Sequence, residues 1–340
     1  APGLVPRYTY ATELRPSAND ALSWSSVCWA PELRRFVAVS RLGSGNRVMT
    51  SQDGVTWTAR VSADDTSFWR SVCWSPELRR FVAVADNGDG ARVMSSEDGI
   101  TWTARSSTNA DWVSVCWAPE LRLFVAVASG GIGNRAMTSP DGITWASTPA
   151  GDDSTYGWWA VCWAPELRRF VAVSDNFTTT SEDGITWTAR TSAFTNGWRS
   201  VCWSAELRLF VAVSTGRAMT SADGITWTNL QTAPAAWRSV CWAPEVHQFV
   251  AVATAGSTAT NLVMTSADGI NWVSHPSAND SFEWFSVCWA PELRLFAAVS
   301  YTGDGNRTML LFVPPPLLPP KSVLSKHLAD GAVTTAQLAD

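Results

Sequence analysis

SVCWAPELRRFVAVS, at residues 26–40, is the stretch of sequence that decides the fold, because closely similar phrases recur six more times along the 340-residue chain. The other copies begin at residues 71, 114, 160, 200, 239 and 286. A phrase repeated in this way marks a structural unit rather than a single site. The chain is therefore a tandem repeat, and its fold follows from the fold of one unit.

Each unit contains four short apolar segments of strand length, which in the first unit occupy residues 24–30, 35–40, 47–51 and 56–61. An Ala-Pro-Glu-Leu turn follows the first segment and a Ser-x-Asp-Gly turn follows the third. Four antiparallel strands in about 40–45 residues are typical of a propeller blade, which buries its faces against neighbouring blades. The sequence predicts an all-β, seven-bladed β-propeller of four-stranded antiparallel blades, with a linear β-solenoid as the alternative.

The two ends of the chain predict how the ring closes. The seventh unit has no Ser-x-Asp-Gly turn and no fourth strand, whereas residues 8–14 form a strand-like segment without a partner before the first unit. We expect this N-terminal strand to complete the last blade. The propeller would then span residues 1–312, with a proline-rich linker at 313–322 and a short C-terminal segment at 323–340.

Composition argues against several classes of partner. A net charge of −5 with only 16% charged residues does not suit a nucleic-acid surface. The chain has no apolar run of about 18 residues for membrane insertion. The seven cysteines stand one per unit without a CxxC pair, so we expect reduced, buried thiols in a reducing host cytoplasm, and neither a metal site nor a cofactor.

The turn after the third strand resembles the Asp-box of sialidase-like propellers, in which Ser, Asp, Gly and Trp lock a hairpin. One departure is that Asp and Gly adjoin in SQDGVTW (51–57), where the family places a residue between them. The resemblance implies a structural turn away from any active site. Its aspartates are Asp53, Asp98, Asp141, Asp183, Asp223 and Asp268.

Two further resemblances bear on function. Tandem tryptophan-rich repeats of this kind look like the seven-bladed bacterial lectin propellers. HLADGAVTTAQLAD (327–340) looks like the short repeats of bacteriophage tail-fibre proteins. They imply a tail-associated virion protein whose partners are glycans or another virion protein, and whose C-terminal segment associates with copies of itself or with another fibre section.

The sequence contains no constellation that predicts catalysis. A sialidase-like glycoside hydrolase would need a tyrosine nucleophile, an arginine cluster and converging carboxylates, yet no family motif surrounds Tyr156 or Tyr301. The glutamates of the Pro-Glu-Leu turns recur in every unit and are better explained as turn carboxylates. We therefore expect no catalytic residues and no enzymatic activity, and keep a hydrolase as the third alternative.

The tryptophan at the start of the first strand is the candidate binding residue. An indole at the rim offers an apolar plane to a sugar ring, and neighbouring Arg70, Arg199 and Arg238 offer hydrogen bonds. The seven leading tryptophans are Trp24, Trp69, Trp112, Trp158, Trp198, Trp237 and Trp284. Together they predict a multivalent, lectin-like recognition module that gains avidity from equivalent sites; the alternative is a structural or docking propeller in which these rings are core.

The loops that vary in length between units all belong to one side of the predicted disc. They connect the second strand to the third and one unit to the next, whereas the Pro-Glu-Leu and Ser-x-Asp-Gly turns keep their lengths. We expect one constant, structural face and one variable face suited to binding.

Overall fold

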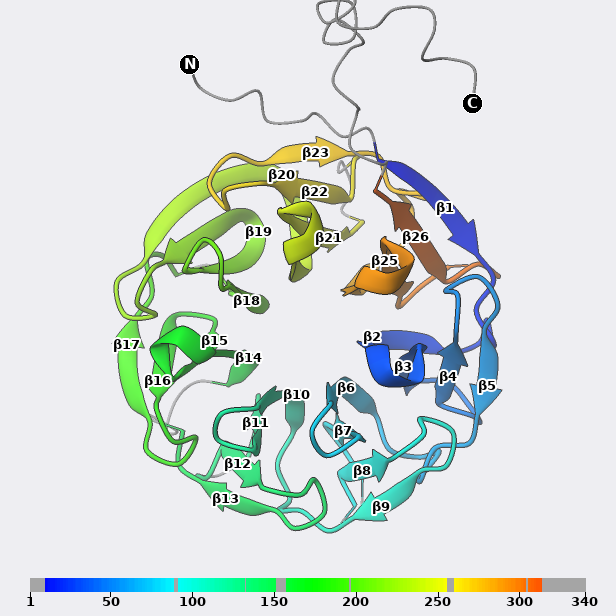
Figure 1. Cartoon of the computed structure of the whole chain (residues 1–340), viewed down its shortest axis with the longest axis horizontal. Coiled ribbons are helices and arrows are strands. Elements are labelled where there is room, and N and C mark those ends of the chain that lie inside the picture. The colour runs from blue at the N-terminus through cyan, green and yellow to red at the C-terminus, as the bar shows by residue number, and fades with distance from the viewer. Residues whose placement is uncertain are drawn as a thin grey trace, which may run out of the picture.

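The computed structural model describes residues 10–88, 91–131, 133–150, 157–195, 197–255, 260–303 and 305–313. The strands are arranged radially around a central axis, with β2, β6, β10, β14 and β18 innermost and β5, β9, β13, β17 and β23 at the edge (Figure 1). The chain is an all-β propeller of antiparallel blades, as predicted. The predicted C-terminal segment at 323–340, and the linker at 313–322 apart from Val313, lie outside the described residues.

Five sheets have four strands each. The first two contain β2 (Ser23–Ala30), β3 (Arg35–Leu42), β4 (Val48–Ser51) and β5 (Thr58–Arg60), then β6 (Trp69–Ser75), β7 (Arg80–Ala85), β8 (Val93–Ser96) and β9 (Thr103–Arg105). The next two contain β10 (Trp112–Ala118), β11 (Leu123–Ala128), β12 (Ala136–Ser139) and β13 (Ala146–Thr148), then β14 (Trp158–Ala164), β15 (Arg169–Ser174), β16 (Phe177–Ser181) and β17 (Thr188–Thr191). The fifth contains β24 (Trp284–Ala290), β25 (Leu295–Ser300), β26 (Thr308–Phe312) and β1 (Ala11–Arg15).

The sixth sheet has six strands and corrects the predicted blade number. It contains β18 (Ser200–Ser204), β19 (Leu209–Ser221), β20 (Thr228–Ala243), β21 (Gln248–Thr254), β22 (Val263–Ser266) and β23 (Val273–His275). Two sequence units share this sheet because β20 runs from the outer strand of one unit into the inner strand of the next. Ala236 pairs with Thr215 on one side and with Thr254 on the other. Counted as hydrogen-bonded sheets, the propeller therefore has six blades and not seven.

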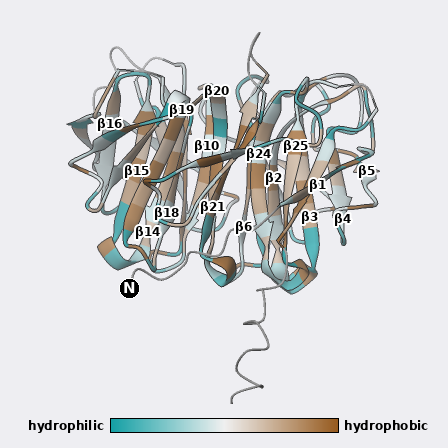
Figure 2. Cartoon of the chain, turned by 90° about the horizontal axis from the view of Figure 1, so that it is seen from above, coloured by the Kyte–Doolittle hydropathy of each residue, from teal (hydrophilic) through white to brown (hydrophobic). Residues whose placement is uncertain are grey.

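The disc has two different faces, which are seen edge-on in Figure 2. We call the side where the inner strands begin the variable face, and the side with the Pro-Glu-Leu and Ser-x-Asp-Gly turns the constant face. Three of the Pro-Glu-Leu turns and the equivalent Pro-Glu-Val turn are 3-10 helices: η1 (Pro31–Leu33), η2 (Pro165–Leu167), η4 (Pro291–Leu293) and η3 (Pro244–Val246). None of the helices in the described part of the chain is long or apolar enough to cross a membrane.

The first strand of the chain lies beside the last. β1 pairs antiparallel with β26, with Ala11 opposite Phe312 and Arg15 opposite Thr308. The predicted strand at 8–14 therefore lies slightly later, at Ala11–Arg15, and supplies the outer strand of the sheet that contains β24 to β26. Ring closure thus depends on hydrogen bonds between the two ends of the described chain.

The Ser-x-Asp-Gly turn is held by its own side chains. In the first unit Asp53 Oδ1 accepts from the N–H groups of Val55 and Thr56 at 2.8 and 2.9 Å, and Ser51 Oγ accepts from the N–H of Gly54 at 2.8 Å. The Trp57 indole donates to the Gly54 carbonyl at 2.8 Å. Gly54 has φ of +75°, and a Cβ there would lie 2.9 Å from Leu310. The aspartates of the other five turns make the same two bonds to backbone N–H groups.

These bonds keep the turn aspartates ionised. Burial on its own would raise the pKa of Asp183, but the N–H groups of Thr186 and Ile185 and the Ser181 hydroxyl lower it below the usual value. A carboxyl whose pKa is lower in the folded than in the unfolded chain stabilises the fold above the unfolded pKa. This contribution is lost as the pH falls through the folded pKa.

Replacing Asp183 with alanine should lower the free energy of unfolding by about 1–3 kcal/mol near neutral pH, because two backbone donors lose their acceptor. The matched control, Glu182→Ala, alters an exposed neighbour and should change it by less than about 0.5 kcal/mol. Urea unfolding measures both. The Asp183 effect should shrink as the pH falls through the lowered pKa of the folded carboxyl; a loss that is constant with pH would contradict this account.

The seven cysteines lie on the innermost strands and are all free and half-buried: Cys28, Cys73, Cys116, Cys162, Cys202, Cys241 and Cys288. Burial raises the pKa of every one of these thiols. Thiols of neighbouring units also lie close enough that the charge of Cys73 further raises the pKa of Cys28. The thiols therefore stay protonated near neutral pH.

Iodoacetamide at about pH 8 should alkylate the native protein at least about tenfold more slowly than free cysteine, because only the thiolate reacts. Unfolding in urea should bring all seven thiols to the rate of free cysteine. Mass spectrometry of timed samples measures this. Rapid labelling of the folded protein would show that the thiols are not held in their protonated form.

Candidate functional site

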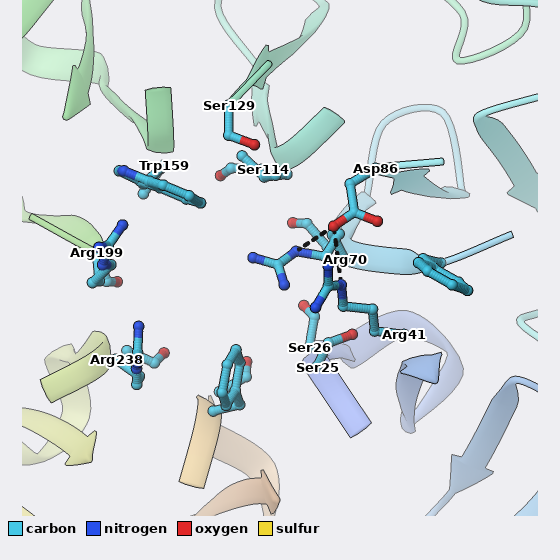
Figure 3. A pocket seen from close by; sticks show the side chains of 18 of the residues that line it. Ser25, Ser26, Arg41, Arg70, Asp86, Ser114, Ser129, Trp159, Arg199 and Arg238 are labelled. Carbon is cyan, nitrogen blue, oxygen red and sulfur yellow. Dashed lines mark hydrogen bonds and ion pairs between the residues drawn. The ribbon is translucent and has the colours of Figure 1, made fainter. Parts of the chain in front are cut away.

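A cavity of about 640 Å³ lies at the centre of the propeller, where the inner strands begin (Figure 3). Every sequence unit contributes the two residues that follow its leading tryptophan. The second of these is serine in six units and Ala160 in the other. The first differs between most units and reads Ser25, Arg70, Val113, Trp159, Arg199, Arg238 and Phe285. The most variable position of the inner strand therefore lines the cavity.

A β-bulge explains why this position faces the cavity. In the second unit Trp69 pairs with Ala85 and Ser71 pairs with Val84, so Arg70 is an extra residue without a partner. The same register shift occurs in five other units, at Ser25, Val113, Trp159, Arg238 and Phe285. A bulge turns the side chain of the extra residue away from its regular direction, and bulges are common beside functional sites.

The bulge also corrects the expectation for the leading tryptophans. In a regular strand the side chain of Trp24 would lie on the same side as those of Ser26 and Cys28. The extra residue between Trp24 and Ser26 reverses this alternation, so the Trp24 ring points into the space between units. The rings are at most 1% exposed and have no free face for a sugar. The tryptophans in these core positions are Trp24, Trp69, Trp112, Trp158, Trp198, Trp237 and Trp284. They contribute packing rather than seven equivalent rim sites.

Serine hydroxyls join the inner strands below the variable residues. Ser26 Oγ accepts from the N–H of Val72 in the next unit at 3.2 Å. Equivalent bonds of 3.1–3.2 Å join five more pairs of adjacent units. The remaining junction has Ala160 in place of serine, next to Trp159 in the cavity wall.

Arginines from two sides give the cavity its charge. Arg199 and Arg238 lie on one side, and Arg41, Arg70 and Asp86 lie on the other (Figure 3). Asp86 Oδ2 is shared by Arg41 Nε at 3.0 Å and Arg70 Nε at 3.6 Å. This cluster therefore keeps one net positive charge.

The charges on the other side are balanced only in part. Arg199 lies 3.3 Å from Asp175, whereas Arg238 has no carboxylate within ion-pair distance among the described residues and interacts with a carboxylate only through the more distant charge of Glu283. Burial lowers the pKa of Arg238, and the charge of Arg199 lowers it further, while the charge of Glu283 opposes both in part. Positive charge thus accumulates in a partly desolvated space, where an anionic ligand would relieve the repulsion.

Aromatic rings flank the arginines. The Arg199 guanidinium lies 4.3 Å from the Trp159 ring centroid, and that of Arg238 lies 5.4 Å from the Phe285 centroid. Tyr301 stacks on Phe285 at 4.8 Å, and its hydroxyl accepts from Arg41 at 3.3 Å. The cavity therefore combines cations, apolar rings and hydroxyls, as sites for polar ligands often do.

The structure brings together three of the predicted site residues, Arg70, Arg199 and Arg238, in one cavity. Sequence reasoning missed Trp159, Arg41 and Asp86. Trp159 could have been found by comparing the units, because it occupies the most variable position of the inner strand. Arg41 and Asp86 lie in loops of different length, and no pattern in the sequence shows that these loops meet.

Other titratable residues have structural partners. Glu32 in the Pro-Glu-Leu turn accepts from the Trp74 indole at 2.7 Å, and five of its equivalents also accept from a tryptophan of the next unit around the ring. His247 instead contacts Glu206 at 3.0 Å. Tyr156 lies outside the described residues. Within the described ranges no group of three or more His, Cys, Asp or Glu side chains is placed to hold a metal ion.

No protein-family model and no curated protein sequence matches the chain. The Asp-box, lectin and tail-fibre resemblances therefore have no support from these comparisons. Solved structures do match the fold. Virginiamycin B lyase from Staphylococcus aureus is 8% identical with a TM-score of 0.74, over 90% of this chain and 100% of its own.

Two further structures give the same result. A streptogramin B lyase is 5% identical with a TM-score of 0.75, over 90% of this chain and 98% of its own. A structure of YCF48 bound to D1 peptide is 13% identical with a TM-score of 0.64, over 92% of this chain and 99% of its own.

The lyases correct one sequence-based expectation. The prediction that the protein is not an enzyme was wrong. Two lyases have this propeller fold, so the fold gives no ground for excluding catalysis. At sequence identities of 5–13%, these structures show that the fold is shared and do not show a shared activity. The chain is a β-propeller, similar in fold to both lyases and peptide-binding propellers.

Proposed function

We propose that the protein is a recognition module that binds an acidic glycan in the central cavity of its variable face. The observation that carries the proposal is that the most variable position of the inner strand lines this cavity. The scaffold repeats, and so do the serines of the cavity wall, whereas the lining residue directly after each leading tryptophan changes between most units. This contrast supports a ligand that contacts several different side chains at once, in one composite site.

The lining favours an anionic, hydroxyl-rich ligand. Arg70, Arg199 and Arg238 provide charged donors suited to an acidic group. Trp159 and Phe285 provide apolar surface of the kind that packs against a sugar ring. The resemblance of residues 327–340 to tail-fibre repeats supports placing the module on a phage-like tail, and this location remains a prediction because that segment lies outside the described residues.

Docking of an acidic peptide is the second candidate function. Propellers of similar fold bind peptides, as the structure of YCF48 bound to D1 peptide illustrates. The same arginines would then contact carboxylates of a protein partner, such as another virion component. The cavity chemistry is shared, so the two candidates differ in the partner and not in the site.

The test is a binding screen of the full chain against neutral, carboxylated and sulfated glycans, with aspartate- and glutamate-rich peptides on the same array. We expect binding to acidic glycans that weakens as the salt concentration rises. Arg238→Gln should reduce the affinity about 10–100-fold, because a charged hydrogen bond contributes about 1.5–3 kcal/mol.

Arg208→Gln is the matched control. It removes the same charge from an exposed arginine on the constant face and should leave the affinity unchanged. Equal loss in both variants would point to nonspecific attraction and not to the cavity. Binding of acidic peptides without any glycan would establish the docking function instead.

A further inference from the structure

Six serines form a ring of hydroxyl groups in the cavity, each one residue further along its inner strand than the variable position. The members of this serine ring are Ser26, Ser71, Ser114, Ser200, Ser239 and Ser286. Each Oγ accepts a backbone N–H of the next unit at 3.1–3.2 Å, which fixes the position of the oxygen. A serine hydroxyl is also a donor, and none of these six hydrogens has an acceptor among the described residues. The serine ring therefore offers donors to whatever occupies the cavity.

Three members of the serine ring stand directly after an arginine of the cavity wall. Arg70 precedes Ser71 and lies across the cavity from Arg199 and Arg238, which also precede serines of the ring (Figure 3). The side chains of Arg70 and Arg199 are 17% and 29% exposed, so a ligand can reach them. Hydroxyl donors and positive charges therefore approach the cavity from both sides.

The carboxylates of the cavity wall already have cationic partners. Among the described residues that line the cavity, Asp86 is shared by Arg41 and Arg70, and Asp111 lies 2.9 Å from Arg92. The wall thus has more donors than free acceptors. A negatively charged group with several acceptor oxygens matches it best.

Acidic groups differ in the arrangement of donors that they need. A carboxylate is planar, and one bidentate arginine can pair with both of its oxygens. A phosphate ester presents three strong acceptor oxygens around its ester bond, and a sulfate ester has the same tetrahedral shape. Donors placed around a central axis, as in the serine ring, suit the tetrahedral group and exceed what a carboxylate can use.

We propose that the serine ring is the seat of a tetrahedral oxyanion, the sulfate or phosphate ester of a glycan, with Arg70, Arg199 and Arg238 as its counter-charges. This inference rests on the proposed function and narrows its acidic glycans to those that carry such an ester. The serine hydroxyls donate to the ester oxygens, and the sugar ring lies towards the variable face. Ala160 leaves one gap in the ring.

The first test uses the full-length protein without substitutions. Glucose 6-sulfate, glucose 6-phosphate, glucuronate and glucose are compared by ligand-observed NMR and calorimetry near neutral pH, since they share a sugar ring and differ in the acidic group. We expect one ester to bind about tenfold or more tightly than glucuronate, because several charge-assisted bonds replace one bidentate pair. The tighter ester identifies the acid.

Two results of this comparison would overturn the inference. If glucuronate binds as tightly as both esters, the oxyanion seat is refuted although the acidic-glycan function stands. If none of the three acidic sugars binds, the seat is refuted as well, and the glycan screen decides the proposed function separately.

The second test removes one hydroxyl of the serine ring. Ser200→Ala should lower ester affinity about 2–10-fold, the effect of one hydrogen bond, and leave glucuronate affinity unchanged. Ser204→Ala is the matched control on the same strand, because Ser204 Oγ also accepts a backbone N–H at 3.2 Å, from Leu207, but lies outside the cavity lining. Equal loss of ester affinity in both variants would show that these serines only hold the backbone.

The third test adds the missing hydroxyl and so does not depend on a weakened fold. Ala160→Ser should raise ester affinity about 2–10-fold, with glucuronate affinity unchanged. Unchanged ester affinity in this variant would overturn the proposal even if Ser200→Ala does not fold.

Discussion

The extra residue in the inner strands is the constraint on which the rest of the structure depends. It rotates the leading tryptophan into the space between units, where the ring is buried. It also leaves the next residue without a strand partner, free to differ from unit to unit without disturbing the ladder. Core packing and cavity lining are therefore provided by adjacent residues of one strand, such as Trp69 and Arg70.

The symmetry of the scaffold is broken at the cavity and at one junction. Six serine hydroxyls each link two neighbouring inner strands, and Ala160 interrupts the series beside Trp159. Arg41 of the first unit contacts Asp86 of the second and Tyr301 of the seventh, so loops from three units share one network. The seven similar units therefore line one asymmetric cavity and do not form seven equal sites.

Much of this fold could be predicted from the sequence, because strand length, turn residues and repetition are local signals. The number of blades could not be predicted. Two units merge into one sheet because Ala236 pairs with a strand on each side, and no turn residue in the sequence indicates this pairing. The leading tryptophans were misplaced because a one-residue bulge reverses the direction expected from alternation. The three arginines were identified from their position beside the variable loops, whereas Asp86 lies in a loop that no sequence pattern places beside Arg41 and Arg70.

The pairing of β1 with β26 fixes how the disc is held. Phe312 lies opposite Leu295, which follows the η4 turn on the constant face, and Ala11 lies opposite Phe312. The chain therefore enters and leaves the ring at one point on its outer edge, at the constant side. The two ends of the described ring therefore lie together on the face opposite to the cavity.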